Sequence, residues 1–118
     1  MRVLLVDDDP PVRRRAREIL LEAEPDADIV EAGTAHDAMK LVVEQDWDAA
    51  VVDFNLPDES GLDVLGMLAR ARPTTRVVVV SALPGDMYET AARGAGAQAF
   101  IPKEEMDRRL VPAVFGPG

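Results

Sequence analysis

The stretch that decides the fold is Val3-Leu4-Leu5-Val6-Asp7-Asp8-Asp9-Pro10. Four consecutive apolar residues with no polar alternation are typical of a strand that is buried on both faces of a parallel sheet. Acids then end the run, and Asp9 followed by Pro10 is the pattern of an N-cap with proline in the first helical turn. The stretch therefore predicts a buried strand, an acidic turn and the start of a helix.

The same pattern of an apolar run followed by a helical segment recurs along the chain. Residues 28–31 predict a more exposed strand, and continuously apolar runs predict three more buried ones: Ala49–Val52, Val77–Val80 and Ala99–Ile101. Segments of helical period lie between these runs, and cap signals at Thr34, Ser60 and Asp86 mark the starts of helices.

The C-terminal segment is expected to carry a fifth helix that begins near Glu104. Pro112 should end this helix, because a proline ring clashes with the preceding turn, so residues 112–118 are expected to form an irregular tail or the start of a linker. The alternation of strands and helices over residues 1–118 predicts a single α/β domain. Its doubly wound, five-stranded parallel sheet would carry five helices.

Composition and charge restrict the class of function. The chain has 118 residues and a formal net charge of −9, which argues against direct contact with nucleic acid. The basic run over residues 13–17 lies in the first predicted helix, where Glu18 and Glu22 are expected to pair with it on a solvated face. Cysteine is absent, which excludes thiolate metal sites. The apolar start is too short for a signal peptide or a membrane span, so we expect a cytoplasmic location.

Acidic side chains follow two strands of the predicted sheet. Asp7 and Asp8 come directly after the first strand, and Asp53 comes directly after the third. The common strand order 2-1-3-4-5 makes these strands neighbours, so their carboxylates would meet at the carboxyl edge of the sheet. Such a cluster needs a counter-ion, and Mg2+ prefers oxygen ligands of this kind. Asp9 is better explained as the helix cap, and Asp53 taken alone could equally be a turn residue.

Two further polar residues reach the same predicted edge. Ser81 ends the fourth strand, and Lys103 follows the fifth. A carboxylate nucleophile, a divalent cation, a hydroxyl donor and an ammonium group are the parts that a phosphoryl acceptor needs. The sequence therefore favours the formation of an aspartyl phosphate on Asp53.

The chain resembles the receiver domains of two-component response regulators. The segments that carry the resemblance are Val3-Leu4-Leu5-Val6-Asp7-Asp8-Asp9-Pro10, Val52-Asp53-Phe54-Asn55-Leu56-Pro57 with Gly61, Val80-Ser81-Ala82, and Ala99-Phe100-Ile101-Pro102-Lys103. The resemblance implies a flavodoxin-like sheet of order 2-1-3-4-5. The loop after Asp53 and the non-proline residue Glu104 after Lys103 are similar to receivers of the LuxR and NarL type. A cis peptide after Lys103 would cost about 2.5 to 4 kcal/mol, because Glu104 is not proline.

The resemblance also implies the chemistry of the acceptor site. Asp53 would be phosphorylated by a sensor histidine kinase or a phosphotransfer protein, and Lys103 would bind a phosphoryl oxygen. Asp7, Asp8, Asp53 and the backbone carbonyl of Asn55 would hold Mg2+, for which Mn2+ could substitute.

A switch is implied as well. The hydroxyl of Ser81 would be drawn toward the phosphate, and the ring of Phe100 would respond. Because Phe100 stands where tyrosine is common in the family, it would signal by packing alone. The change would reach the face formed by the fourth helix, the fifth strand and the fifth helix.

The resemblance implies a signalling phosphoacceptor that catalyses its own phosphorylation and dephosphorylation rather than an enzyme with an external substrate. Its output would be another domain or a downstream protein, such as a DNA-binding domain outside this chain, and it would be a monomer or a phosphorylation-dependent dimer.

A degenerate interaction module is an alternative, but it would lack one of the site residues. A phosphohydrolase would need a second aspartate at the position of Asn55. The chain could also be a receiver cut from a longer regulator.

Overall fold

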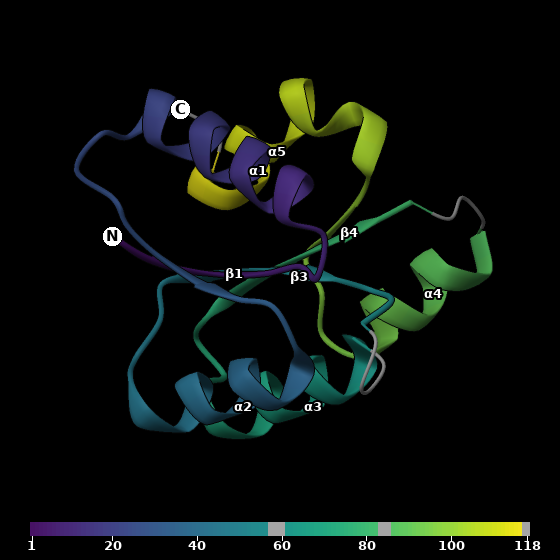
Figure 1. The fold of residues 1–118 in the computed structure, drawn as a ribbon. Helices are drawn as coiled ribbons and strands as arrows, with labels where there is room; N and C mark the ends of the chain where they lie inside the picture. Colours follow the sequence, from purple (N-terminus) through teal and green to yellow (C-terminus); the bar gives the residue numbers. More distant parts are fainter. Residues whose placement is uncertain (57–60, 83–85, 117–118) are drawn as a thin grey trace.

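The fold, seen in a computed structural model, is one five-stranded parallel sheet with helices on both faces (Figure 1). The structure describes residues 1–56, 61–82 and 86–116. The strands are β1 (Arg2–Val6), β2 (Asp28–Ala32), β3 (Ala49–Asp53), β4 (Arg76–Ser81) and β5 (Ala99–Pro102). The helices are α1 (Pro10–Ala23), α2 (Ala35–Glu44), α3 (Gly61–Ala71), α4 (Asp86–Gly94) and α5 (Met106–Phe115), with a 3-10 turn, η1 (Lys103–Glu105), before α5. The strand order β2-β1-β3-β4-β5 confirms the predicted doubly wound sheet.

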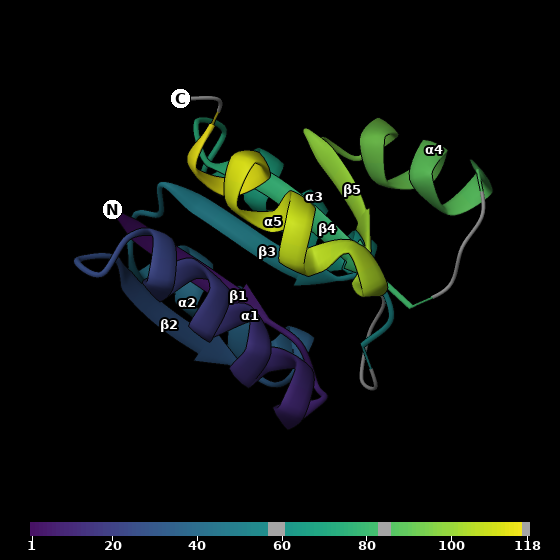
Figure 2. The ribbon, with the colours of Figure 1, turned by 90° about the horizontal axis from the view of Figure 1, so that it is seen from above.

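The sheet is covered on both faces. Helices α1 and α5 lie over one face, and α2 and α3 lie over the other, with α4 beside β5 (Figures 1 and 2). On β1, Val3 and Leu5 pack toward α1 and α5, whereas Leu4 and Val6 pack toward α2 and α3, and all four are at most 1 % exposed. Successive side chains of a strand alternate between the two faces, so an unbroken apolar run is what a doubly covered strand requires. None of the helices in the described ranges is long and apolar enough to cross a membrane.

The register of the strands brings their carboxyl ends to one edge. The pairs nearest this edge are Val6 with Val52, Asp53 with Val80, and Ser81 with Pro102. Beyond β1, the amide of Asp7 donates a hydrogen bond to the carbonyl of Ala32 at 3.1 Å, which extends the ladder by one step. The residues that follow β1 and β3 therefore leave the sheet side by side.

The prediction that Pro112 ends the last helix was wrong. Helix α5 continues through it to Phe115, and the amide of Gly116 donates to the carbonyl of Pro112 at 3.0 Å. Proline in a helix interior costs about 3 kcal/mol. Leu110 and Val114, on either side of it, are fully buried, and each contributes about 1.5 to 3 kcal/mol. Burial of these two side chains therefore offsets the missing hydrogen bond, and the expected irregular tail is helical as far as residue 115.

The predicted caps at Asp9 and Thr34 lie at the starts of α1 and α2, with one difference in bonding. Thr34 accepts a hydrogen bond from the amide of Asp37 at 3.1 Å. Asp9 occupies the N-cap of α1, but its side chain makes no cap hydrogen bond, and of the first three helical residues only Val12 has an N–H to offer. Ser60 and the side chain of Asp86 lie outside the described residues.

Some large apolar residues of the helices are exposed. Val43, Leu62 and Tyr88 are 56 %, 37 % and 39 % exposed. A helix touches a sheet along a narrow stripe, so a residue next to a buried one, as Val43 is next to Val42, turns toward solvent. Within the described ranges every peptide bond is trans, including the one after Lys103.

Candidate functional site

Asp53 is a buried acid at the end of β3. The residue is 3 % exposed. Its Oδ1 accepts a hydrogen bond from the amide of Asn55 at 3.1 Å, and its Oδ2 lies 3.3 Å from Nζ of Lys103. The first contact is the local turn bond that aspartate often makes. The second joins Asp53 to a residue fifty positions away, which a turn role alone does not explain.

Asp7 and Asp8 meet Asp53 across the edge of the sheet. Asp7 is 2 % exposed, whereas Asp8 is exposed. Oδ2 of Asp7 lies 3.1 Å from Nζ of Lys103, and its Oδ1 accepts the amide hydrogen of Asp9 at 2.9 Å. One carboxylate oxygen from each of Asp7, Asp8 and Asp53 lies within 4.8 Å of the other two. The structure thus brings together the acids that the strand order predicted to meet.

The donor set of this cluster fits a hard divalent cation. All three side chains offer carboxylate oxygens, which suit Mg2+. Mg2+ uses one or two carboxylates and keeps several waters, and the exposed position of Asp8 leaves the cluster open to solvent on one side. Asn55, whose backbone carbonyl is the fourth predicted ligand, follows Asp53 by two residues and is exposed.

The electrostatics of the site are set by burial and by one lysine. Burial raises the pKa of Asp53 to about 6, with a further upward contribution from Asp7, while the amide of Asn55 and the ammonium of Lys103 oppose the shift. Burial acts to lower the pKa of Lys103, but the carboxylates of Asp53 and Asp7 outweigh it and raise that pKa above its ordinary value. Lys103 therefore stays charged and acts as a fixed counter-ion between the two buried acids.

The predicted switch residues lie on neighbouring strands. Ser81, the last residue of β4, is 1 % exposed, and Phe100 on β5 is 5 % exposed. The ring of Phe100 packs edge to face against Phe54 with 6.3 Å between centroids, and Phe54 packs in the same way against Tyr88 of α4 at 5.7 Å. An aromatic row thus connects the residue after Asp53 to α4. The sequence gives no role to Phe54 beyond its place in the motif, although aromatic residues make up only 4 % of the chain and this one stands directly after the candidate acceptor.

Gly61 allows the start of α3 to approach the site backbone. A Cβ atom at this position would lie 2.6 Å from the carbonyl oxygen of Asp53 and 2.9 Å from Cα of Phe54. The amide of Gly61 donates to the carbonyl of Phe54 at 2.9 Å. Any side chain would force this contact apart, so the close approach of the two segments requires glycine at position 61.

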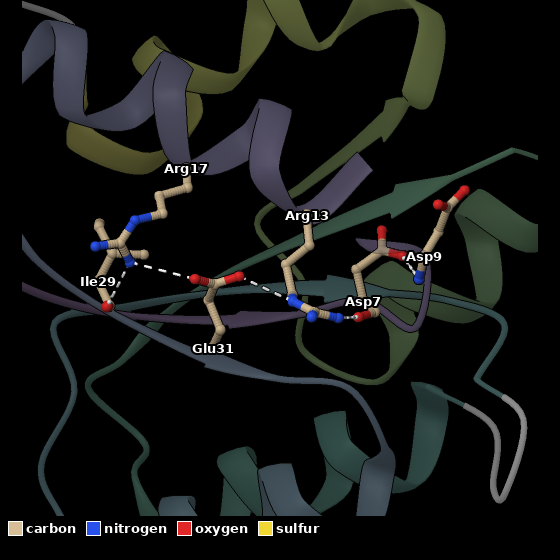
Figure 3. Close-up of polar contacts among 6 residues, drawn as sticks. All are labelled: Asp7, Asp9, Arg13, Arg17, Ile29 and Glu31. Carbon is tan, nitrogen blue, oxygen red and sulfur yellow. Dashed lines mark hydrogen bonds and ion pairs between the residues drawn. The ribbon is translucent and has the colours of Figure 1, made fainter. Parts of the chain in front are cut away.

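The basic run in α1 forms the predicted solvated face only in part: exposed Arg15 lies 3.9 Å from Glu18, as expected, but two other arginines of the run turn to the sheet. Arg13 and Arg17 both reach Glu31 on β2, at 2.9 and 3.3 Å, instead of pairing within the helix (Figure 3). Nη1 of Arg13 also donates to the backbone carbonyl of Asp7 at 2.6 Å. Spacing of four residues predicts that the two arginines share a helix face, but the sequence does not show that this face meets β2.

A family model and the curated relatives of this chain agree on one family. The family model described as "Response regulator receiver domain" matches residues 3–115. The nitrate/nitrite response regulator protein NarP of Escherichia coli is 33 % identical over 113 residues, which cover 95 % of this chain and 52 % of NarP. The DNA-binding transcriptional activator DevR/DosR of Mycobacterium tuberculosis is 35 % identical over 115 residues, which cover 97 % of this chain and 52 % of that protein. The chain thus spans about half the length of these curated relatives.

Solved structures give the same fold. A CheY-like response regulator receiver domain protein from Methanospirillum hungatei superposes with a TM-score of 0.84 at 26 % identity, over 93 % of this chain and 86 % of that one. A two-component response regulator of the LuxR family from Aurantimonas sp. superposes with a TM-score of 0.83 at 31 % identity, over 93 % of this chain and 79 % of that one. Both likenesses extend over 93 % of this chain.

Proposed function

The chain belongs to the response regulator receiver domains, and from that premise we propose that it accepts a phosphoryl group on Asp53 and passes the signal to an output partner. One observation carries the proposal: Nζ of Lys103 lies 3.1 Å from Asp7 and 3.3 Å from Asp53, in a cluster whose third acid is Asp8. A buried carboxylate beside a fixed ammonium and a candidate cation site has the charge distribution that a transferring phosphoryl group needs.

The carboxylates of Asp7, Asp8 and Asp53, with the backbone carbonyl of Asn55, would hold Mg2+ in this proposal. Bound Mg2+ would neutralise charge on the transferring phosphoryl group, and we expect Mn2+ to substitute for it. The chemical support is the set of oxygen donors within 4.8 Å of one another.

The phosphoryl donor would be the phosphohistidine of a sensor kinase or a phosphotransfer protein. An ionised oxygen of Asp53 would attack phosphorus as the phosphorus–nitrogen bond breaks, and the electron pair of that bond would remain on the departing imidazole nitrogen. Lys103 would bind one phosphoryl oxygen, and the hydroxyl of Ser81 would donate to another. Burial raises the pKa of Asp53 to about 6 in the metal-free site, and bound Mg2+ would lower it and keep the attacking carboxylate ionised.

The output would follow from a movement of Ser81 toward the phosphate. Phe100 on the neighbouring strand would repack, and its contact with Phe54, which also touches Tyr88 of α4, offers a physical route to the face formed by α4, β5 and α5. DevR/DosR is named a DNA-binding transcriptional activator, so we propose a transcriptional output outside this chain. We further propose a cytoplasmic protein that is a monomer or a phosphorylation-dependent dimer and that dephosphorylates itself.

Incubation with acetyl phosphate tests the proposal. We expect intact-mass measurement to show one phosphoryl adduct on the wild-type protein when Mg2+ is present and none when EDTA removes it. Asp53→Asn should show no adduct under either condition. A wild-type protein that stays unmodified in Mg2+, or an equal adduct on Asp53→Asn, would refute the assignment.

A further inference from the structure

Arg13 is connected to the acidic cluster through the backbone of Asp7. Its Nη1 donates to the carbonyl oxygen of Asp7 at 2.6 Å, and its Nε lies 2.9 Å from Oε1 of Glu31 (Figure 3). The side chain of Arg13 is 22 % exposed, against 41 % for Arg17. Arg13 therefore links three elements: α1, which carries it, β2, which carries Glu31, and the turn that follows β1.

The peptide between Asp7 and Asp8 is held by this contact. The amide of Asp7 is bonded to Ala32, its carboxylate is bonded to the amide of Asp9 and to Lys103, and its carbonyl is bonded to Arg13. Because a peptide unit is planar, fixing the carbonyl of Asp7 also fixes the direction in which the backbone of Asp8 begins. The exposed carboxylate of Asp8 thus starts from a restrained position.

The start of α1 gives Arg13 a rigid base. Pro10 and Pro11 occupy the first helical positions, where their rings fix φ, and the amide of Arg13 makes the bond to the carbonyl of Asp9 at 2.9 Å. Glu31 then holds the guanidinium from the side of β2. A planar fork with several donors can bond a carboxylate and a carbonyl together, whereas an ammonium has no such fixed geometry.

Arg17 makes a similar connection between α1 and β2 without reaching the site. Its Nη1 lies 3.3 Å from Oε2 of Glu31 and donates to the carbonyl of Ile29 at 3.1 Å. Figure 3 shows Glu31 between the two arginines, with Arg13 alone directed to Asp7. Arg17 therefore helps to hold α1 on β2, whereas Arg13 does this and also supports the acidic turn.

We propose that Arg13, held by Glu31, is a positioning residue that orients Asp7 and Asp8 for binding the divalent cation. The inference rests on the proposed function, since that cation is the one required for phosphorylation of Asp53. Arg13 can affect Mg2+ affinity through its charge or through its support of the ligands, and the two effects are opposite in sign. A nearby guanidinium repels a cation, so losing its charge alone would tighten Mg2+ binding. Losing its support of the ligands would weaken binding, and partners of metal ligands typically contribute about 10-fold to 100-fold in affinity.

The test compares Arg13→Met with Arg17→Met, which makes the same change one helical turn further on. Mg2+ affinity is measured by calorimetry at pH 8 without a phosphoryl donor. In EDTA, hydrogen exchange at the amide of Asp9, which bonds Asp7, reports on the metal-free turn. We expect Arg13→Met to bind Mg2+ about 10-fold or more weakly and to exchange this amide faster. Arg17→Met should match the wild type in both measurements, and Arg13→Lys should recover only part of the affinity.

Glu31→Gln provides a second route to the same answer if Arg13→Met does not fold. It leaves Arg13 in place but weakens its anchor, so the amide of Asp9 should again exchange faster in EDTA, where no cation is bound and the lost charge of Glu31 cannot act on it. Affinity of Arg13→Met equal to or greater than that of the wild type, or an equal loss in Arg17→Met, would overturn the role of Arg13. A wild-type protein that binds no Mg2+ would instead overturn the proposed function together with this inference, so the two failures are distinguishable.

Discussion

Asparagine in place of Asp53 should stabilise the metal-free protein at alkaline pH. Burial raises the pKa of Asp53 from its ordinary value of 3.8 to about 6, so ionisation is less favourable in the folded state than in the unfolded state. The difference corresponds to about 3 kcal/mol once both states are ionised. The carboxylate lies at the end of a strand, where solvent screening reduces this to about 2 kcal/mol. We therefore expect Asp53→Asn to raise the free energy of unfolding by about 2 kcal/mol at pH 8.

The gain should depend on pH in a defined direction. A raised pKa means that the folded protein binds the proton of Asp53 more tightly than the unfolded chain does. This contribution to wild-type stability is fully present below pH 3.8 and is lost as the pH rises through about 6. The advantage of Asp53→Asn should therefore grow between pH 3.8 and about 6, reaching about half of its full value at pH 5 and all of it at pH 8.

Urea unfolding followed by circular dichroism at these two pH values, in EDTA, measures the effect. Asp26→Asn is the matched control, because it removes one negative charge from an exposed turn far from the edge that carries Asp53. The control should show little change at either pH. A gain that is equal at pH 5 and pH 8, a loss of stability in Asp53→Asn at pH 8, or the same gain in Asp26→Asn would refute the reasoning.

Three further substitutions test the packing and charge of the site by urea unfolding. Lys103→Met leaves two buried carboxylates without their counter-ion and should lower the free energy of unfolding by about 3 kcal/mol at pH 8 in EDTA; unchanged stability would contradict that role. Gly61→Ala places a Cβ 2.6 Å from the carbonyl oxygen of Asp53 and should cost about 1 to 3 kcal/mol. Gly94→Ala, which meets no atom within 4 Å, is its control and should cost nothing. Phe100→Ala should cost about 3 to 5 kcal/mol, and a loss below about 1 kcal/mol would show that its ring is not core.

The parts of the fold that could be predicted from the sequence are those where several signals agree. In β1 and β3, an unbroken apolar run, an acid directly after it and a following helix all indicate a doubly covered strand with a polar end. The order of the strands then decides which acids meet, and that order came from a general rule about open sheets. Asp7 and Asp53 were therefore placed together before any contact was known.

Other features depend on neighbours that local sequence does not reveal. Pro112 alone predicts a helix end, but the burial of Leu110 and Val114 keeps α5 intact around it. Arg13 was assigned to a solvated face, because its partners, Glu31 and the carbonyl of Asp7, become visible only when α1 is packed on the sheet. Phe54 was missed for the same reason, since its ring contacts come from β5 and α4.

The measurement that tests the central claim most directly is the location of the phosphoryl group. The wild-type protein would be incubated with acetyl phosphate with and without Mg2+, then treated with borohydride, which reduces an aspartyl phosphate to homoserine. The protein would be digested, and its peptides sequenced by mass spectrometry. We predict homoserine at position 53 only in the sample that contained Mg2+. Homoserine at position 7 or 8 instead, or none at any position after treatment in Mg2+, would contradict the assignment of Asp53 as the phosphoryl acceptor.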